Sequence, residues 1–248
     1  MPIIVRRYKF SQAAYIERMR KTVNQTGFRT DKPWGCVSLS VEWLSNVFLT
    51  PEEDEWLREL HCIAVANTGE KTVEDIFWGK GAKASARKRM AALEKSSLSG
   101  NSTLFNKVFN QQANLFLHSY QDVLEKHSKR IAILLLSHRL KQVGMPFVYD
   151  EQGSDLLFNK MLNRPDSDGL LVAVMRKDGT AHYVALYSPV GRSKGYSYFG
   201  NQMLAFDADS GEYSFEKQCF ADWFWSNIAM RGNVERIIGI YVALRDSD

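Results

Sequence analysis

The two halves of the chain carry hydrophobic patterns of different period, and the order of these patterns constrains the fold more than any other feature. Before about Gly144 the apolar residues recur three to four positions apart, as in "CVSLSVEWLSNVF" (36–48), and this spacing predicts helices. After Gly144 short β-rich runs flank turn residues, and Lys177-Asp178-Gly179 predicts a hairpin. Helices followed by an antiparallel sheet define the α+β class, which is the fold class we expect.

Further elements are expected on both sides of this change. The helix over 36–48 is predicted to bury one apolar face, made of Val37, Val41, Leu44 and Phe48. Other elements are predicted as follows: helices over 51–66, Lys80–Lys95, Leu104–His127 and Glu216–Met230, a second hairpin over 202–215 around Ser210-Gly211, and a final buried strand over Val234–Leu244. One aromatic cluster is expected in the core under the sheet: Phe220, Trp223, Phe224 and Trp225.

Composition and charge exclude several classes of function. The formal net charge of +4 is too small to imply nucleic-acid binding by itself. Three cysteines without a Cys-x-x-Cys pair argue against a disulfide framework and favour a reducing compartment. The histidines lack the mutual spacing of metal ligands. The N-terminus has no apolar run of a secretory signal, and the longest apolar run, Ile131–Leu136, is too short to cross a bilayer.

Three separate stretches supply the residue types of a nucleophilic site. Cys36 follows Gly35 at the predicted start of a helix, where free backbone N–H groups favour a thiolate and can hold an oxyanion. His182 lies inside a predicted strand, and Asp207 ends the next strand. A thiol needs a general base, and the base needs a third group to orient it. Asp209 could compete for that third role, but we prefer Asp207 because Asp209 falls in the turn "DADSG", where aspartate caps the backbone.

Short motifs surround these three residues: "GCVSLSVEWL" around Cys36, "GTAHYVALY" around His182 and "FDADSGEYSF" around Asp207. Together they resemble the papain-like cysteine proteases, and most specifically the YopT/AvrPphB family of bacterial effector proteases. The resemblance implies a single papain-like domain over 1–248, with 1–30 as a candidate delivery or leader segment. It also implies that the triad hydrolyses a peptide bond, with no metal and no organic cofactor.

The same resemblance implies a biological setting. The chain would be secreted by a bacterium into the host-cell cytosol without an N-terminal signal peptide, and its substrate would be a host signalling protein. Two features depart from the family pattern: Asp207-Ala208-Asp209 replaces the usual Asp-Pro-Asn, and Ser188–Met203 looks like an insertion beside the site. Papain-like enzymes also use a Gln or Asn side chain before the cysteine as an oxyanion donor, and Gln25 is our candidate. Trp34 would either line the substrate cleft or anchor its loop.

Two other functions stay open. In other enzymes the same triad catalyses glutamine deamidation, transglutamination and acyl transfer, because different nucleophiles can attack the thioester intermediate. A non-catalytic interaction module would instead use Trp34 and the basic run Lys80–Arg89 as contacts. That run is expected to be a solvated helix face, with an anionic partner as the alternative. The remaining cysteines and histidines are expected to be structural, surface or satisfied core residues: Cys62, Cys219, His61, His118, His127 and His138.

Overall fold

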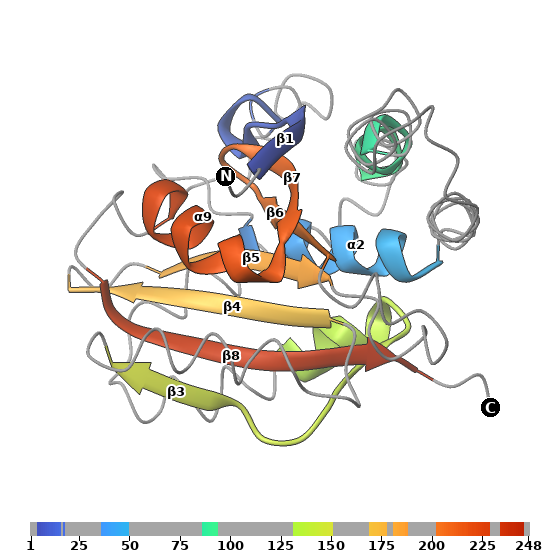
Figure 1. Ribbon diagram of the computed structural model, residues 1–248. Helices are drawn as coiled ribbons and strands as arrows, with labels where there is room; N and C mark the ends of the chain where they lie inside the picture. Colours follow the sequence, from blue (N-terminus) through green and yellow to red (C-terminus); the bar gives the residue numbers. More distant parts are fainter. Residues whose placement is uncertain are drawn as a thin grey trace, which may run out of the picture.

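The described part of the chain forms an antiparallel sheet with helices on both of its faces (Figure 1). This computed structural model describes residues 4–15, 17, 36–49, 86–93, 131–150, 169–177, 181–187, 202–228 and 234–245. Several predictions lie outside these residues: the helices over 51–66 and Leu104–His127, the insertion up to residue 201, and Cys62, His61, His118 and His127.

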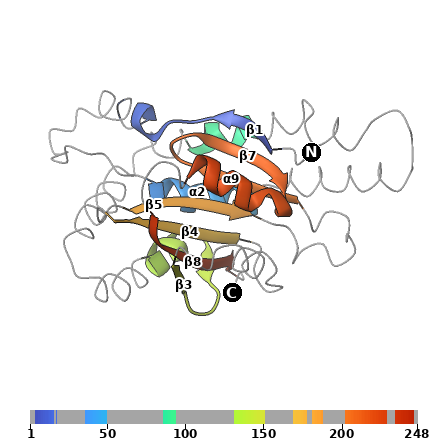
Figure 2. The ribbon, with the colours of Figure 1, turned by 60° about the vertical axis from the view of Figure 1, so that its left-hand side comes forward.

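Among the described residues the sheet has eight strands. They are β1 (Ile4–Lys9), β2 (Leu140–Gln142), β3 (Phe147–Asp150), β4 (Gly169–Arg176), β5 (Ala181–Tyr187), β6 (Gln202–Asp207), β7 (Gly211–Glu216) and β8 (Val234–Leu244). Their order is β1-β7-β6-β5-β4-β8-β2, β3 also pairs with β8, and every pair is antiparallel. With helices on both sides (Figure 2), the α+β class expected from the sequence is confirmed.

Two hairpins form the middle of the sheet, and both were expected from their turn residues. β4 and β5 flank Lys177-Asp178-Gly179, with Val172 opposite Val184. β6 and β7 flank the turn that ends at Gly211, whose φ of 119° excludes most side chains. A Cβ atom at Gly211 would also lie 1.9 Å from the Tyr8 carbonyl oxygen. The final strand β8 has the bounds predicted from the sequence.

The helix α2 (Cys36–Leu49) lies on one face of the sheet and packs mainly against β5. The predicted apolar face is confirmed, because its four residues are buried: Val37, Val41, Leu44 and Phe48. The burial is wider than predicted and includes Leu39, Ser40 and Trp43. Partial exposure follows one stripe of every fourth residue: Ser38, Glu42 and Asn46. In the described part of the chain, no helix is long and apolar enough to span a membrane.

The helix α9 (Phe220–Asn227) covers the opposite face of the sheet (Figure 2). The element begins with a 3-10 turn, η2 (Lys217–Cys219), so the predicted helix over Glu216–Met230 is confirmed in its central part. The aromatic cluster packs in the core as expected: Phe220, Trp223 and Phe224 are buried and Trp225 is half-buried. Cys219 is a buried free cysteine, which agrees with a structural role.

The N-terminal strand β1 pairs with β7 along the edge of the sheet. Beyond the strand, the Phe10 N–H donates to the Ser210 carbonyl oxygen at 3.3 Å, and the Gln12 N–H donates to the Ala208 carbonyl oxygen at 2.7 Å. These backbone bonds place the start of the 1–30 segment against the β6–β7 turn. Residues 4–12 are therefore an integral part of the described fold.

The helical residues 86–93 correct one prediction from the sequence. Arg87 and Lys88 are exposed, as expected for a solvated face, but Arg89 is only 2% exposed. Its Nε and Nη2 atoms donate to the two carboxylate oxygens of Glu212 on β7, at 3.0 and 2.5 Å. A buried guanidinium needs such a bidentate partner because an isolated charge in the core is costly. Arg89 is therefore not available to an anionic partner of the basic run.

Candidate active site

Cys36 is the first residue of α2, as the sequence predicted. At this position its backbone N–H has no partner inside the helix, so it can donate to an anion. The helix is held on the sheet by Trp43, whose ring stacks on Phe206 of β6, and by Ser40, whose hydroxyl donates to the Tyr183 carbonyl oxygen at 3.4 Å. Cys36 is buried, with an exposed fraction of 2%.

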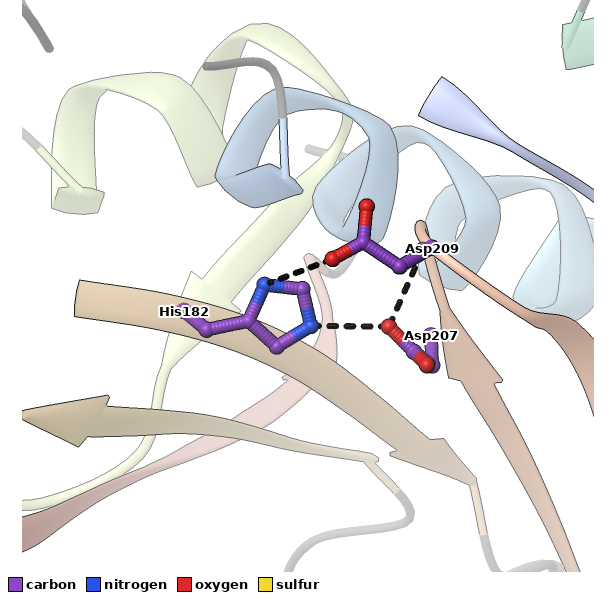
Figure 3. Close-up of side chains that lie close together, drawn as sticks. All are labelled: His182, Asp207 and Asp209. Atoms are coloured by element: carbon purple, nitrogen blue, oxygen red, sulfur yellow. Dashed lines mark hydrogen bonds and ion pairs between the residues drawn. The ribbon is translucent and has the colours of Figure 1, made fainter. Parts of the chain in front are cut away.

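His182 and Asp207 lie on neighbouring strands that are paired in the sheet. Val184 on β5 is opposite Asp207 on β6, which puts His182 two residues further along its strand, beside the β6–β7 turn. The Nε2 atom of His182 lies 2.7 Å from Oδ1 of Asp207 (Figure 3). Both side chains are buried, with exposed fractions of 2% and 0%, so the pair interacts in a low-dielectric setting.

Two donors from the β6–β7 turn and the His182 ring hold the Asp207 carboxylate. Oδ1 accepts the Asp209 backbone N–H at 3.0 Å, and Oδ2 accepts the hydroxyl of Ser210. The Ser210 backbone N–H donates to the Asp207 carbonyl oxygen at 3.1 Å, which closes the turn. Because three donors, including the His182 ring, surround the carboxylate, Asp207 holds the imidazole in one orientation.

Asp209 lies on the other side of the imidazole (Figure 3). Its Oδ2 atom is 3.8 Å from Nδ1 of His182, and its Oδ1 atom accepts a hydrogen bond from Nε2 of Gln12 at 2.8 Å. The sequence favoured Asp207 because Asp209 was expected to cap the turn. That reason was wrong, because in the structure the Asp207 side chain caps the turn. Asp207 nevertheless makes the shorter contact with His182.

The electrostatics of the site favour a charged imidazole. Burial lowers the pKa of His182, but hydrogen bonds to Asp207 and Cys36 and the negative charges of both outweigh it. The net effect raises the pKa of His182 from 6.5 to about 10, so the ring is an imidazolium at neutral pH. The same hydrogen bond links the Cys36 side chain to the ring.

Three ligand-type side chains meet at this site, and the sequence had given no metal-ligand spacing. Ligand atoms of His182, Asp207 and Asp209 lie within 4.8 Å of one another. The contacts within this group are the ion pairs of His182 with Asp207 at 2.7 Å and with Asp209 at 3.8 Å.

The sequence analysis missed two residues of the site, Gln12 and Ser210. Gln12 reaches Asp209 from the segment after β1, which lies far away along the chain and carries no local signal. Ser210 had one weak signal, because Asp-x-x-Ser is a common turn pattern in which the hydroxyl reaches back to the carboxylate. The predicted oxyanion donor Gln25 and the loop residue Trp34 lie outside the described residues.

No protein-family model matches the chain, and no curated protein matches its sequence. Among solved structures, the chain is similar to the crystal structure of the Pseudomonas avirulence protein AvrPphB. The identity is 14% and the TM-score 0.43, and the match covers 84% of this chain and 91% of that one. AvrPphB belongs to the family that the sequence motifs resemble. At this identity and TM-score the likeness assigns no role to any residue.

Proposed function

We propose that the protein is a cysteine peptidase in which Cys36 is the nucleophile, His182 the general base and acid, and Asp207 the orienting group. The main support for the proposal is that one imidazole, that of His182, interacts with both Asp207 and Cys36. His182 binds Asp207 through Nε2 at 2.7 Å and shares a hydrogen bond with the Cys36 side chain. Since Nε2 is held by Asp207, Nδ1 is the atom that exchanges a proton with the thiol.

The first half of the reaction forms an acyl-enzyme. The Cys36 sulfur, whose proton has moved to Nδ1 of His182, attacks the carbonyl carbon of the peptide and forms a C–S bond. The Cys36 backbone N–H donates to the oxyanion, and Gln25 is our candidate for a second donor. The C–N bond then breaks, and Nδ1 of His182 gives its proton to the leaving amine.

The second half of the reaction regenerates the enzyme. Water attacks the thioester, and Nδ1 of His182 accepts the proton that water loses. The C–S bond breaks, which releases a carboxylic acid and returns the sulfur as a thiolate beside the imidazolium. No metal ion and no organic cofactor takes part in this sequence of steps.

The biological part of the proposal rests on the sequence motifs. Their resemblance to the effector proteases supports a host signalling protein as substrate and delivery into the host-cell cytosol. A reducing cytosol also suits a reactive thiol and a chain with few cysteines. We propose that the chain acts as a single domain in that setting.

Site-resolved alkylation of the thiols tests the catalytic part. The protein is treated briefly with iodoacetamide at pH ~6, and modification of each cysteine is measured by mass spectrometry. An ordinary thiol, with a pKa near ~8.5, reacts slowly at this pH, whereas a thiolate held by an imidazolium reacts fast. We expect Cys36 to react at least about tenfold faster than Cys219, and His182→Gln to remove that difference. Equal rates for the two cysteines would contradict the proposal.

Product analysis tests the reaction type. Host-cell protein extract is incubated with the wild-type protein or with Cys36→Ala, and new N-termini are compared by mass spectrometry. Chain cleavage that requires Cys36 supports a peptidase. A mass gain of about 1 Da on glutamine would show that the protein is a deamidase, and an added amine would show that it is a transglutaminase. A biological effect that persists in Cys36→Ala would support the non-catalytic interaction module.

A further inference from the structure

A second carboxylate stands at the nitrogen of His182 that the proposed reaction uses. Asp207 occupies Nε2, whereas Asp209 lies on the side of Nδ1, with its Oδ2 atom 3.8 Å away (Figure 3). The triad needs one carboxylate to orient the ring, and Asp207 already makes that contact. Asp209 therefore has no role in the steps of the proposed reaction.

Asp209 is held in place and is also open to solvent. The Nε2 atom of Gln12 donates to its Oδ1 atom at 2.8 Å, and Gln12 is itself buried. The Asp209 backbone N–H is bound by Asp207, and the neighbouring Ala208 carbonyl oxygen is bound by the Gln12 N–H. The Asp209 side chain is nevertheless 39% exposed. The turn thus presents a preorganised negative charge at the surface of the site.

The position of this charge relative to a substrate follows from the proton transfers. The leaving amine takes its proton from Nδ1 of His182, so its nitrogen comes within about 3 Å of that atom. With Oδ2 of Asp209 3.8 Å from Nδ1, the leaving nitrogen lies no more than about 7 Å from the carboxylate. The side chain of the residue that follows the scissile bond extends from this same point.

We propose that Asp209 gives the leaving-group side of the site a preference for cations, so that the substrate carries Lys or Arg directly after the scissile bond. This inference rests on the proposed cysteine peptidase function and names its substrate class. A basic side chain at that position is attracted to Asp209, and an acidic one is repelled. At a separation of about 6 Å near the protein surface, one unit charge changes a rate by about threefold to tenfold.

Thiol reagents of different charge test the inference without a known substrate. Three methanethiosulfonates modify Cys36 by the same chemistry: a neutral methyl reagent, a cationic trimethylammonium-ethyl reagent and an anionic sulfonatoethyl reagent. The rate of Cys36 modification by each is measured by mass spectrometry at low ionic strength. We expect the cationic reagent to react faster than the anionic one, and Asp209→Asn to lower the cation-to-anion rate ratio at least about fivefold. In 1 M salt the difference between the two proteins should shrink, because the charge is screened.

A matched substitution controls for total charge. Asp222→Asn removes the same charge from an exposed position on α9, and it should leave the rate ratio within about twofold of wild type. The neutral reagent distinguishes a failure of the cation preference from a failure of the proposed peptidase function. If it labels Cys36 fast and the rate ratio is the same in wild type and Asp209→Asn, only the cation preference is overturned. If it labels Cys36 no faster than Cys219, the peptidase function fails and the inference fails with it.

A peptide library gives a second readout on the intact protein. Peptides derived from a proteome are incubated with the wild-type chain, and the residues after each Cys36-dependent cut are counted. The inference expects Lys and Arg to be enriched at the first position after the cut and Asp and Glu to be depleted. Asp209→Asn should reduce that enrichment at least about threefold. Cuts with no enrichment of basic residues would overturn the inference.

Discussion

The indole ring of Trp43 stacks on the phenyl ring of Phe206, with ring centroids 5.6 Å apart and an interplanar angle of 13°. Trp43 belongs to the helix that begins at Cys36, and Phe206 directly precedes Asp207. Both rings are fully buried. The stack therefore joins the helix of the proposed nucleophile to the strand of the proposed orienting carboxylate.

Phe206→Leu should damage both stability and the site. Loss of the stacked ring is expected to lower the free energy of unfolding by about 1–3 kcal/mol. In the protein that remains folded, the Cys36 alkylation rate at pH ~6 should fall, because α2 is less well fixed against β6. Phe220→Leu is the matched control, since Phe220 is equally buried but lies on the α9 side of the sheet. Equal loss of the Cys36 rate in both variants would show that the stack has no special role.

Glu212 should be the most sensitive residue of the buried network that joins β1, α2, residues 86–93 and β7. Burial raises the pKa of this carboxyl, but the charges of Arg89 and Arg7 and the hydrogen bonds from Arg89 and Trp43 lower it overall. Glu212→Gln leaves the buried Arg89 guanidinium uncompensated, so the free energy of unfolding should fall by about 3–5 kcal/mol. Urea denaturation of the purified protein measures this loss.

Arg87, on the same helix as Arg89, is the control for the network around Glu212. Arg87 is exposed, and Arg87→Met should change the free energy of unfolding by less than about 0.5 kcal/mol. The combined change Glu212→Leu with Arg89→Met should be less destabilising than Glu212→Leu alone, because it leaves one buried guanidinium, that of Arg7, without the Glu212 carboxylate instead of two. If Glu212→Gln proves as mild as Arg87→Met, the buried ion pair contributes little.

The raised pKa of His182 predicts a pH-dependent contribution to stability. Below about pH 6.5 the ring is protonated in the folded and unfolded states, and its ion pairs contribute fully. Between pH 6.5 and about 10 the folded protein holds a proton that the unfolded chain has released, so stability falls as pH rises. The difference in unfolding free energy between wild type and His182→Gln should therefore shrink from pH 6 to pH 10.

His138 provides the control for that pH dependence. Burial lowers the pKa of His138, with a smaller opposing effect from its hydrogen bond to the Leu134 carbonyl oxygen. Above about pH 6.5 this ring is neutral in both states, so the difference between wild type and His138→Gln should stay constant from pH 7 to pH 10. A parallel decline for both histidines would point to a general effect of alkaline pH.

The sequence predicts those parts of the fold whose signals are local. The hairpins around Lys177-Asp178-Gly179 and Ser210-Gly211 follow from their turn residues, and β8 follows from its apolar run. The approach of His182 to Asp207 follows from the pairing of neighbouring strands, and the structure places them in contact.

The parts that could not be predicted depend on partners far along the chain. Arg89 resembles Arg87 in its local sequence, and its bidentate contact with Glu212, 123 residues away, accompanies its burial in the core. Gln12 and Asp209 are 197 residues apart, and no periodic pattern connects them. The wide burial of α2 was also missed, because Ser40 gives no apolar signal but donates to the Tyr183 carbonyl oxygen.

Glu42→Gln should stabilise the protein in a pH-dependent way. Burial on α2 raises the pKa of Glu42 from 4.5 to about 7. Between these values the folded chain holds a proton that the unfolded chain has lost, so the stability contributed by Glu42 falls as pH rises through about 7. At pH 8 the variant should gain about 1–3 kcal/mol over wild type, and at pH 4.5 little or nothing. Glu235→Gln, at an exposed position of β8, should change stability by less than about 0.5 kcal/mol at both pH values.

Two buried serines near the site should respond in opposite ways to removal of the hydroxyl. The Ser210 hydroxyl donates to Oδ2 of Asp207, so Ser210→Ala leaves a buried carboxylate oxygen without its donor. We expect a loss of about 1–3 kcal/mol in unfolding free energy and a slower Cys36 alkylation at pH ~6, because Asp207 no longer fixes His182. The hydroxyl of Ser214 has no hydrogen-bond partner in the described part of the chain. Ser214→Ala should therefore be neutral or slightly stabilising and should leave the alkylation rate unchanged. If Ser210→Ala behaves like Ser214→Ala in both measurements, the turn does not need its hydroxyl to hold the carboxylate.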